Sequence, residues 1–448
     1  MALILTSRRR FLRDVAAAAV AAPLVDLIGA EAFAQAAAGR KIRHASVGAS
    51  GMGFSDISSF AKQPAFDLVA IADVDLCTIA RVQQLFPKVR VYQHWREMLK
   101  REKNQIDSVN VSTPDHMHAP IAMEAMRLGK HVYVQKPLTA TIAEARRLTE
   151  FARRERLVTQ MGIQTSATVP QRLGEAMVRS GMAGKIREVH VFSNKSWGED
   201  GLLPDGSDPV PPTIDWDAWV GVAEMRPYLR GKFHPGEWRR RKAFGTGTLG
   251  DMGCHIFSPS YRALALTSPL SITSHGPTPT RDNWAVRAKF HYVFPGTPLT
   301  AGKTVDYWWY DGTERPPAAL LEQVGARMPQ QGNIFVGTDG LIVVPHGGQP
   351  FALPDEKFKD AKAPEITARD HYAEFLDAIL AGGTIRPAAS FDYSGPLTET
   401  VLLGNVAAHF PGETLEFDAG ALRFPQKVDA NPLLTRPYRK AWRVKGLS

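Results

Sequence analysis

Residues 111–139 read VSTPDHMHAPIAMEAMRLGKHVYVQKPLT, and their pattern predicts a strand, a helix and a second strand. The second strand covers residues 131–135 and ends at Lys136, which Pro137 follows directly. In a central buried strand a lysine at this place is unfavourable, because a desolvated ammonium must be paired or lose its proton. The stretch therefore indicates both a kind of fold and a charge that needs a partner.

The same alternation of strand and helix patterns begins at Lys41 and fills the N-terminal part of the chain. Its strand patterns are near-continuous apolar runs, which are typical of strands buried on both faces of a parallel sheet. We therefore expect an α/β domain with a doubly wound parallel sheet over residues 40–165. The predicted strands cover 42–48, 66–75, 108–115 and 131–135, and the predicted helices cover 51–63, 75–86, 118–129 and 141–155.

A glycine turn follows the first strand, in VGASGMGF at residues 47–54. Gly48 and Gly53 match two glycines of the Rossmann dinucleotide-binding pattern Gly-x-Gly-x-x-Gly, but Ser50 stands at the middle position. Gly51 is adjacent and can take over the close backbone approach to a pyrophosphate, with Met52 next to it. The turn alone is a weak signal, since glycine turns between a strand and a helix are common.

Asp73 ends the second strand, where an acid can hold the ribose hydroxyls of a dinucleotide. A carboxylate there repels a 2′-phosphate, so NAD is favoured over NADP, and the alternative role for Asp73 is a helix N-cap. Ligands of such sheets bind beyond the carboxyl ends of the strands, so the residues that follow the later strands are expected in the same crevice. These cofactor-binding candidates are Ser112, Thr113, Pro114, His118, Gln135 and Lys136.

The passage 111–139 resembles the strand–helix–strand segment of the glucose-fructose oxidoreductase, inositol dehydrogenase and MocA (Gfo/Idh/MocA) family. The second signature of that family, Asp-x-x-x-His, is matched by Asp251 and His255 in GTGTLGDMGCHIFSPSYRAL, residues 245–264. The resemblance carries specific motifs over about residues 41–262, and beyond them it is only architectural.

The family's first motif usually ends in Glu-Lys-Pro, whereas this chain has Gln135 before the lysine. The resemblance implies that Lys136 hydrogen-bonds the reacting oxygen of the substrate, that His255 takes its proton and that Asp251 orients the site. Because no acid precedes the lysine, we expect Asp251, across the crevice, to keep Lys136 charged.

Asp251 and His255 lie four positions apart, so in a helix they share one face. An imidazole beside a carboxylate is a suitable general base, although a capping aspartate and a buried histidine can have the same spacing. A metal site is not expected, because Cys254 adjoins His255 and the three side chains cannot easily converge from one helix.

The C-terminal part, residues 166–448, is predicted to be an α+β substrate and oligomerisation domain with a large open, mostly antiparallel sheet. Trp197, Trp238 and Arg239 are the candidates for substrate contact, since aromatic faces stack on sugar C–H surfaces, although most tryptophans are expected in the core. Residues 200–219 are rich in Pro, Gly and Asp and indicate a long loop that acts as a lid or arm. Helices at about 369–408 are expected to pack back on the Rossmann domain.

Residues 1–34 resemble a twin-arginine (Tat) export signal. They contain Arg8 and Arg9, an alanine-rich apolar stretch and a closing Ala-Phe-Ala before Gln35. We therefore expect the Tat export machinery as a partner, a periplasmic location and no membrane attachment after cleavage, a membrane anchor being the disfavoured alternative. The two cysteines, Cys77 and Cys254, form no disulfide framework and are expected to remain separate thiols.

The composition fits a soluble globular protein, with 44% hydrophobic and 22% charged residues over 448 residues. The formal net charge of +9 is spread along the chain except at the run Arg239–Lys242. No nucleic-acid-binding module accompanies it, so no nucleic-acid partner is expected.

The periplasm is not expected to hold a free NAD(H) pool, so an exported NAD enzyme should keep its cofactor bound and regenerate it. We expect an NAD-dependent oxidoreductase that transfers hydride between a hydroxyl-bearing carbon of a sugar or polyol and nicotinamide C4. The alternative is an NAD-dependent glycoside hydrolase that oxidises, eliminates, hydrates and reduces its substrate, and a sugar sensor without catalysis is disfavoured. An open sheet face is usually covered by another subunit, so a homodimer or tetramer is expected.

Overall fold

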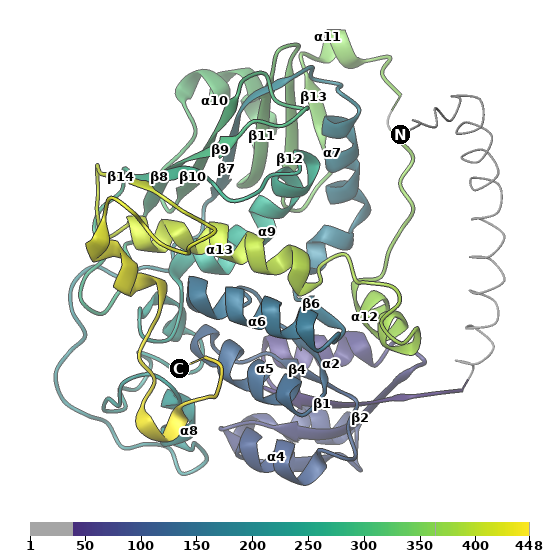
Figure 1. The fold of residues 1–448 in the computed structure, drawn as a ribbon, viewed down its shortest axis with the longest axis vertical. Helices are drawn as coiled ribbons and strands as arrows, with labels where there is room; N and C mark the ends of the chain where they lie inside the picture. The colour runs from purple at the N-terminus through teal and green to yellow at the C-terminus, as the bar shows by residue number, and fades with distance from the viewer. Residues whose placement is uncertain (1–38, 363, 448) are drawn as a thin grey trace, which may run out of the picture.

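A six-stranded parallel sheet forms the N-terminal domain, with the strand order β3-β2-β1-β4-β5-β6 (Figure 1). This is the Rossmann order, and it confirms the predicted doubly wound sheet. Its strands are β1 (Ile42–Val47), β2 (Phe66–Ala72), β3 (Arg90–Tyr92), β4 (Ser108–Val111), β5 (His131–Val134) and β6 (Thr159–Met161). Its helices are α2 (Met52–Phe60), α3 (Ala80–Leu85), α4 (Trp95–Glu102), α5 (His118–Arg127) and α6 (Ile142–Arg154).

The computed structural model describes residues 39–362 and 364–447. The predicted export signal, residues 1–34, lies outside the described residues. Among the residues described, no helix is both long and apolar enough to span a bilayer.

The predicted helix over residues 75–86 is shorter in the structure, where α3 begins only at Ala80. Asp75 instead caps a short 3₁₀ turn by accepting a hydrogen bond from the Cys77 amide. Its backbone also forms a β-bridge with Ile214 from a distant segment. The helix therefore begins at Ala80 rather than at residue 75, because a tertiary contact that the local sequence pattern does not contain holds Asp75.

An eight-stranded sheet forms the C-terminal domain, in the order β13-β12-β11-β7-β10-β9-β8-β14. Only β7 and β10 pair in parallel, so the predicted mostly antiparallel sheet is confirmed. The strands are β7 (Ile186–Ser193), β8 (Ser271–Ser274), β9 (Ala288–Pro295), β10 (Thr304–Asp311), β11 (Gln331–Gly337), β12 (Leu341–Pro345), β13 (Phe351–Leu353) and β14 (Thr414–Glu416). The helices of this part are α7 (Val169–Arg179), α8 (Trp216–Val220), α9 (Gly247–Ala263), α10 (Ala318–Val324), α11 (Asp355–Phe358), α12 (His371–Leu380) and α13 (Phe391–Ala407).

Helices α9 and α13 lie between the two sheets and join the domains (Figure 1). On one side Phe257 of α9 packs against Tyr307 of the large sheet, with ring centroids 4.8 Å apart. On the other side α13 packs on α6, where Arg146 forms an ion pair with Glu399 at 2.7 Å. The core is therefore continuous from one sheet to the other, and α9 is held from both sides.

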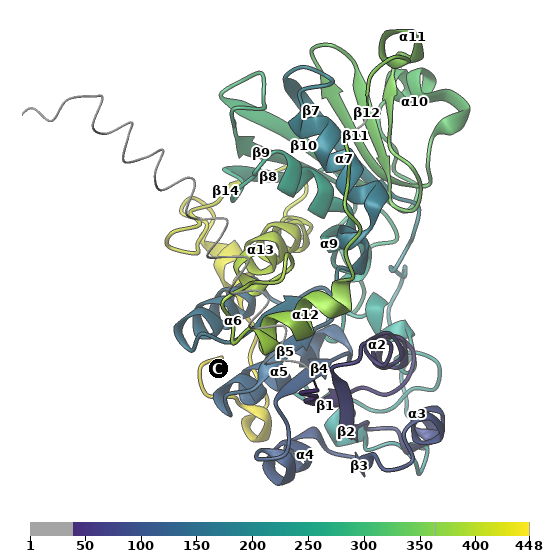
Figure 2. The ribbon, with the colours of Figure 1, turned by 90° about the vertical axis from the view of Figure 1, so that its right-hand side faces the viewer.

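Helix α12 packs on the N-terminal domain beside α2 and β1 (Figure 2). Phe375 is fully buried there, and its ring lies 6.0 Å from the rings of Phe60 and Tyr133. The side chain completes a small core that the N-terminal sheet does not close by itself.

Replacing Phe375 with Ala is expected to lower the free energy of unfolding by about 3–5 kcal/mol, because it removes a fully buried ring. Denaturant unfolding followed by circular dichroism measures the change. Val428→Ala is the control, since Val428 is 71% exposed and its loss should change stability by no more than about 0.5 kcal/mol. Equal losses in the two variants would contradict this packing role.

Candidate functional site

A cavity of about 510 Å³ lies at the carboxyl ends of the N-terminal strands, where residues of both domains meet. Such a place is where open α/β sheets bind their ligands. Most of the predicted site residues line this cavity, namely Gly48, Ser50, Gly51, Met52, Asp73, Ser112, Thr113, Pro114, Gln135, Lys136, Trp238, Arg239 and Asp251.

The glycine turn after β1 is packed against β4 so closely that Gly48 has no space for a side chain. A Cβ on Gly48 would lie 2.5 Å from the carbonyl oxygen of Ser112, and its φ of +92° is itself unfavourable for other residues. Gly53 does not line the cavity, because it packs on the turn, where its Cβ would meet the Gly48 oxygen at 2.5 Å. Its role is helix–turn packing rather than cofactor contact.

The beginning of α2 fits the pyrophosphate of a dinucleotide. Gly51 caps the helix without a side-chain hydrogen bond, and no acidic residue lies in the first turn. Amide groups of the first turn are thus available to an anion, which the helix dipole also favours. A Cβ on Gly51 would meet nothing within 4 Å, so the backbone is open to the cavity at this point.

Asp73 lies directly after β2 and faces the same cavity. Its two carboxylate oxygens accept hydrogen bonds from the amides of Ala49 and Asp75, at 2.9 and 3.0 Å. The N-cap alternative is wrong, because Asp75 caps the next turn and Asp73 is fixed against the glycine turn. The residues present therefore fit NAD, with the turn at its pyrophosphate and Asp73 at its ribose.

His118 was expected to contact the cofactor, but it does not line the cavity. Its ring is buried, with Nδ1 2.7 Å from the carbonyl oxygen of Pro137 and Nε2 2.8 Å from that of Thr113. The imidazole therefore connects the chain after β4 to the chain after β5 from behind. It helps to position Lys136 and Thr113, and its contact with the cofactor stays a prediction.

Gln135 is buried in the wall of the cavity and donates to Asp56 of α2, with its amide nitrogen 3.0 Å from both carboxylate oxygens. Ser112 and Tyr372 also donate to Asp56, at 2.7 and 2.9 Å. Burial raises the pKa of Asp56 to about 6, although these hydrogen bonds oppose the shift. Position 135 carries no acid, but the carboxyl group of Asp56 lies beside it. The side-chain amide of Gln135 can donate a hydrogen bond to this carboxyl group, which a glutamate could not do when ionised.

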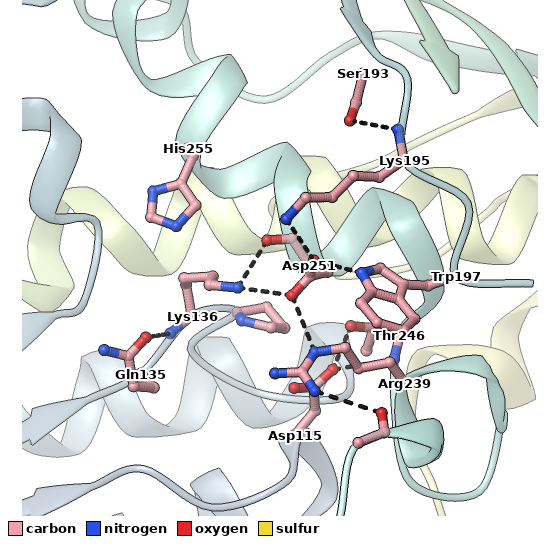
Figure 3. Close-up of polar contacts among 12 residues, drawn as sticks. Asp115, Gln135, Lys136, Ser193, Lys195, Trp197, Arg239, Thr246, Asp251 and His255 are labelled. Carbon is pink, nitrogen blue, oxygen red and sulfur yellow. Dashed lines mark hydrogen bonds and ion pairs between the residues drawn. The ribbon is translucent and has the colours of Figure 1, made fainter. Parts of the chain in front are cut away.

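Lys136 and Asp251 form an ion pair across the domain boundary, as the sequence predicted (Figure 3). The ammonium Nζ lies 2.8 Å from Oδ1 of Asp251 and 2.9 Å from its backbone oxygen. Trp197 Nε1 donates to Oδ2 at 2.8 Å, and Arg239 Nε lies 3.4 Å from Oδ1. Burial would raise the pKa of Asp251, but Lys136 and Arg239 outweigh it and hold the pKa well below its usual range.

His255 lies one turn after Asp251 on α9, with its ring beside Lys136 (Figure 3). It is 9% exposed, and Nδ1 lies 3.3 Å from the hydroxyl of Thr165. Burial, together with the charge of Lys136 and the nearby His346, holds the pKa of His255 well below its usual value. The ring is therefore neutral at neutral pH and able to accept a proton.

Three residues near Asp251 were missed by the sequence reasoning. The Nζ of Lys195 lies 3.8 Å from Oδ2 of Asp251, and its place two residues before Trp197 in an extended segment could have revealed it. The ring of His346 lies 5.4 Å from that of His255, and buried Asp115 accepts from the amide and hydroxyl of Thr246. No local pattern marks either of these, since they are brought in by β12 and by the loop after β4.

The segment from residue 194 to 246, which we call the strap, connects β7 to α9 and crosses the N-terminal domain. Its Thr213 accepts from the Leu76 amide at 3.0 Å, and its His234 lies 2.9 Å from Asp75. The expected loop at 200–219 thus lies against the cavity rim and contains the beginning of α8. The C-terminal stretch covers it in turn, with Arg439 paired to Asp217 at 2.6 Å.

Trp238, a substrate candidate, is only 7% exposed and packs in the apolar cluster of the strap. Its ring supports the guanidinium of Arg239, which lies 4.3 Å from the ring centroid. In the described parts of the chain, no three His, Cys, Asp or Glu side chains are grouped as a metal site would need.

Gly48→Ala is expected to weaken NAD binding at least about tenfold, since the positive φ alone costs about 1–2 kcal/mol and the turn must also move away from Ser112. The NAD(H) content of the purified protein and calorimetric titration measure the effect. Gly181→Ala is the control, because it also has a positive φ, of +76°, but no atom within 4 Å of the added Cβ. A Gly48→Ala protein with unchanged NAD affinity would show that the turn is not the binding site.

Gln135→Glu is expected to destabilise the protein, more at pH 8 than at pH 5, because it places a second carboxylate against Asp56. The folded Asp56 already binds its proton up to a pKa of about 6, against an ordinary 3.8, so its contribution to stability falls as the pH rises between these values. A glutamate at position 135 would add a second carboxyl group next to Asp56, so the loss of stability would continue to higher pH. Thermal unfolding across this range measures it, with Gln135→Met as the uncharged control, and a difference between the variants that does not grow with pH would contradict the account.

Curated relatives match part of the chain. Glycosyl hydrolase family 109 protein 1 of Shewanella sp. (strain ANA-3) is 32% identical over 154 residues, which are 32% of this chain and 33% of that protein. Alpha-N-acetylgalactosaminidase of Shewanella oneidensis is 31% identical over 154 residues, which are again 32% of this chain and 33% of that protein. The match therefore spans about a third of these relatives.

Solved structures match over most of the fold. The WlbA dehydrogenase from Bordetella pertussis, in complex with NADH and UDP-GlcNAcA, superimposes with a TM-score of 0.59. It is 14% identical and covers 85% of this chain and 99% of its own. At this identity the likeness shows the fold alone.

Two family models match successive parts of the chain. Residues 42–163 match the oxidoreductase family with an NAD-binding Rossmann fold, and residues 176–297 match the C-terminal alpha/beta domain of the same oxidoreductase family. Together they cover more than half of the chain and contain Lys136, Asp251 and His255. The protein therefore belongs to the Gfo/Idh/MocA family of oxidoreductases.

Proposed function

We propose that the protein binds NAD tightly and oxidises a hydroxyl-bearing carbon of a sugar, sugar derivative or polyol. One observation carries the proposal: at the edge of a dinucleotide cavity, the ammonium of Lys136 is held by Asp251 beside the neutral ring of His255. Asp73 favours NAD over NADP, because its carboxylate repels a 2′-phosphate.

Each of these side chains has a distinct role in the proposed reaction. Lys136 donates a hydrogen bond to the reacting oxygen and stabilises the alkoxide that develops there. His255 takes the hydroxyl proton, which is worth roughly 10²–10⁴-fold in rate for a positioned base. NAD, when bound, supplies the acceptor for the hydride that leaves the same carbon. The substrate thereby becomes a carbonyl compound, and the ion pair with Asp251 holds Lys136 in place throughout.

We place this reaction in the periplasm, after export by the twin-arginine route, on the strength of the arginine pair and the Ala-Phe-Ala at residues 32–34. Cell fractionation tests the location. A retained cofactor suits a compartment without an expected NAD(H) pool, and the strap supports retention because it lies across the cavity rim. We also expect a dimer or tetramer, since one face of the large sheet carries partly exposed side chains such as Trp308 and His291.

A second function is favoured by the names of the relatives, glycosyl hydrolase family 109 and alpha-N-acetylgalactosaminidase. In that case oxidation at C3 of a glycoside acidifies the C2 proton, the C1 substituent leaves, water adds and the ketone is reduced again. The cycle needs a second group for proton transfer, and His346 beside His255 supplies one. No net oxidation results, so no external acceptor is needed.

Denaturing the purified protein is expected to release about one NAD(H) per chain, detected by absorbance and mass spectrometry. An empty protein that requires millimolar added NAD would overturn the retained cofactor. A panel of sugars should then change the absorbance of the bound cofactor at 340 nm, whereas liberation of phenol from aryl glycosides without added NAD would identify the second function.

Lys136→Met is expected to lower the rate of either reaction by about 10²–10³-fold, because it removes the hydrogen bond to the developing oxyanion. Stopped-flow measurement of cofactor reduction, or steady-state phenol release, follows the rate. Lys303→Gln, which changes an exposed lysine in the turn before β10, is the matched control. Normal turnover by Lys136→Met with its cofactor bound would remove Lys136 from the mechanism.

A further inference from the structure

Three cationic side chains surround the carboxylate of Asp251, and two of them, Lys136 and Arg239, line the cavity (Figure 3). Nitrogen atoms of Lys136, Arg239 and Lys195 lie 2.8, 3.4 and 3.8 Å from the oxygens of Asp251. Only the first of these cations is accounted for by the proposed chemistry, since Lys136 is assigned to the reacting oxygen. The other two have no role in that reaction.

Each carboxylate oxygen of Asp251 already accepts one short hydrogen bond without Lys195 and Arg239. Lys136 donates to Oδ1 and Trp197 donates to Oδ2, both at 2.8 Å. Lys195 lies too far from Oδ2 for a hydrogen bond, and among the described residues its ammonium has no hydrogen-bond acceptor. The contact of Arg239 with Oδ1 is at the limit of hydrogen-bond length, as is its second contact, at 3.4 Å to the Gly236 oxygen. Both cations therefore retain donors for another partner.

The other ionisable groups near this point do not balance the charge. Asp115 is buried and already accepts from the amide and hydroxyl of Thr246. Even when it is ionised, two carboxylates face three cations. His255 and His346 add no negative charge in any state. The substrate end of the cavity is thus left positive, and a site of this kind attracts an anion.

The position of the two cations separates them from the cofactor's own phosphates. The pyrophosphate belongs at the glycine turn and the beginning of α2, whereas both cations gather at Asp251 on α9. The guanidinium of Arg239 lies 4.3 Å from the ring centroid of Trp238 and 5.3 Å from that of Trp197. Lys195 is 44% exposed on its side chain and approaches Asp251 from the large sheet. The two cations thus approach the same carboxylate from different elements, and aromatic rings lie beside Arg239.

We propose that the substrate carries an anionic group, a carboxylate or a phosphate ester, that binds between Lys195 and Arg239. The inference rests on the proposed function, which supplies a sugar as the substrate. It narrows the substrate to a uronic acid, a phosphorylated sugar or a glycoside of either. Arg239 donates to the anion in a planar fork, Lys195 contributes a point charge, and the reacting hydroxyl then reaches Lys136.

Equilibrium binding tests the proposal with matched pairs of probes. The pairs are D-glucuronate and D-galacturonate, each against its methyl ester, and glucose 6-phosphate against glucose, titrated by tryptophan fluorescence on the NAD-loaded protein. At least one anion is expected to bind about 10–100-fold more tightly than its neutral counterpart, as charge-assisted hydrogen bonds of this kind provide. The preference should shrink at high salt. If no anion binds more tightly than its neutral partner, the proposal is wrong.

Lys195→Gln and Arg239→Gln locate the effect. Each is expected to bring the ratio of the two dissociation constants towards one, while Lys303→Gln should leave the ratio at its original value. Thermal unfolding and NAD content show whether each variant is folded. A ratio unchanged in both folded site variants would also overturn the proposal.

Measurements of turnover distinguish a failure of this inference from a failure of the proposed function on which it rests. If neutral and anionic sugars reduce the bound cofactor equally well and bind equally well, the function stands and the anion site does not. If an anion binds through Lys195 and Arg239 but no sugar or aryl glycoside reacts, the anion site stands and the proposed function is wrong.

Discussion

The ammonium of Lys136 and the carboxylate of Asp251 meet across the domain boundary, and the arrangement of the site depends on this contact. Both side chains are largely buried, with exposed fractions of 14% and 9%. Removing one partner of such a pair leaves an unpaired buried charge, at a cost of about 3–5 kcal/mol. The end of β5 and the first turns of α9 are therefore fixed relative to one another. Since α9 is also packed between the two sheets, the position of the nucleotide cavity and that of the substrate side chains are set together.

Below this pair, a second buried carboxylate is handled differently. Within residues 39–362 and 364–447 no cation pairs with Asp56, which accepts hydrogen bonds from the neutral donors Gln135, Ser112 and Tyr372. Tyr372 comes from α12, so the late helix helps to support the cavity floor. The two acids differ in their charge state. Positive charges lower the pKa of Asp251 and keep it ionised, whereas burial raises the pKa of Asp56 and favours its neutral form. The glutamine that breaks the family's usual Glu-Lys-Pro pattern is consistent with this difference.

The parallel sheet, its glycine turn and the Lys136–Asp251 contact could be predicted because each has a local signal, in periodicity or in spacing. The orientation of His118 could not be predicted: it lies at the expected end of the sheet, but its ring contacts two carbonyl groups. Lys195 and His346 could not be found from spacing alone, since they reach the site from β-strand ends more than 50 residues away from Asp251 along the chain. Their role depends on how the large sheet stands over α9, which no local pattern encodes.

The strap leaves the large sheet after β7 and returns to it through α9, and in between it contacts the N-terminal domain, the C-terminal stretch and the segment 280–286. It contributes no strand to either sheet, although its Ala218 and Val222 are part of the large core. Its mostly exposed part, residues 200–213, can therefore change in length and sequence while the hydrophobic cores stay intact. Closure of the cavity is therefore a property of one connection rather than of the fold. Within an architecture of this kind, enzymes that exchange their nucleotide freely and enzymes that never release it can diverge by insertion or deletion at a single surface segment.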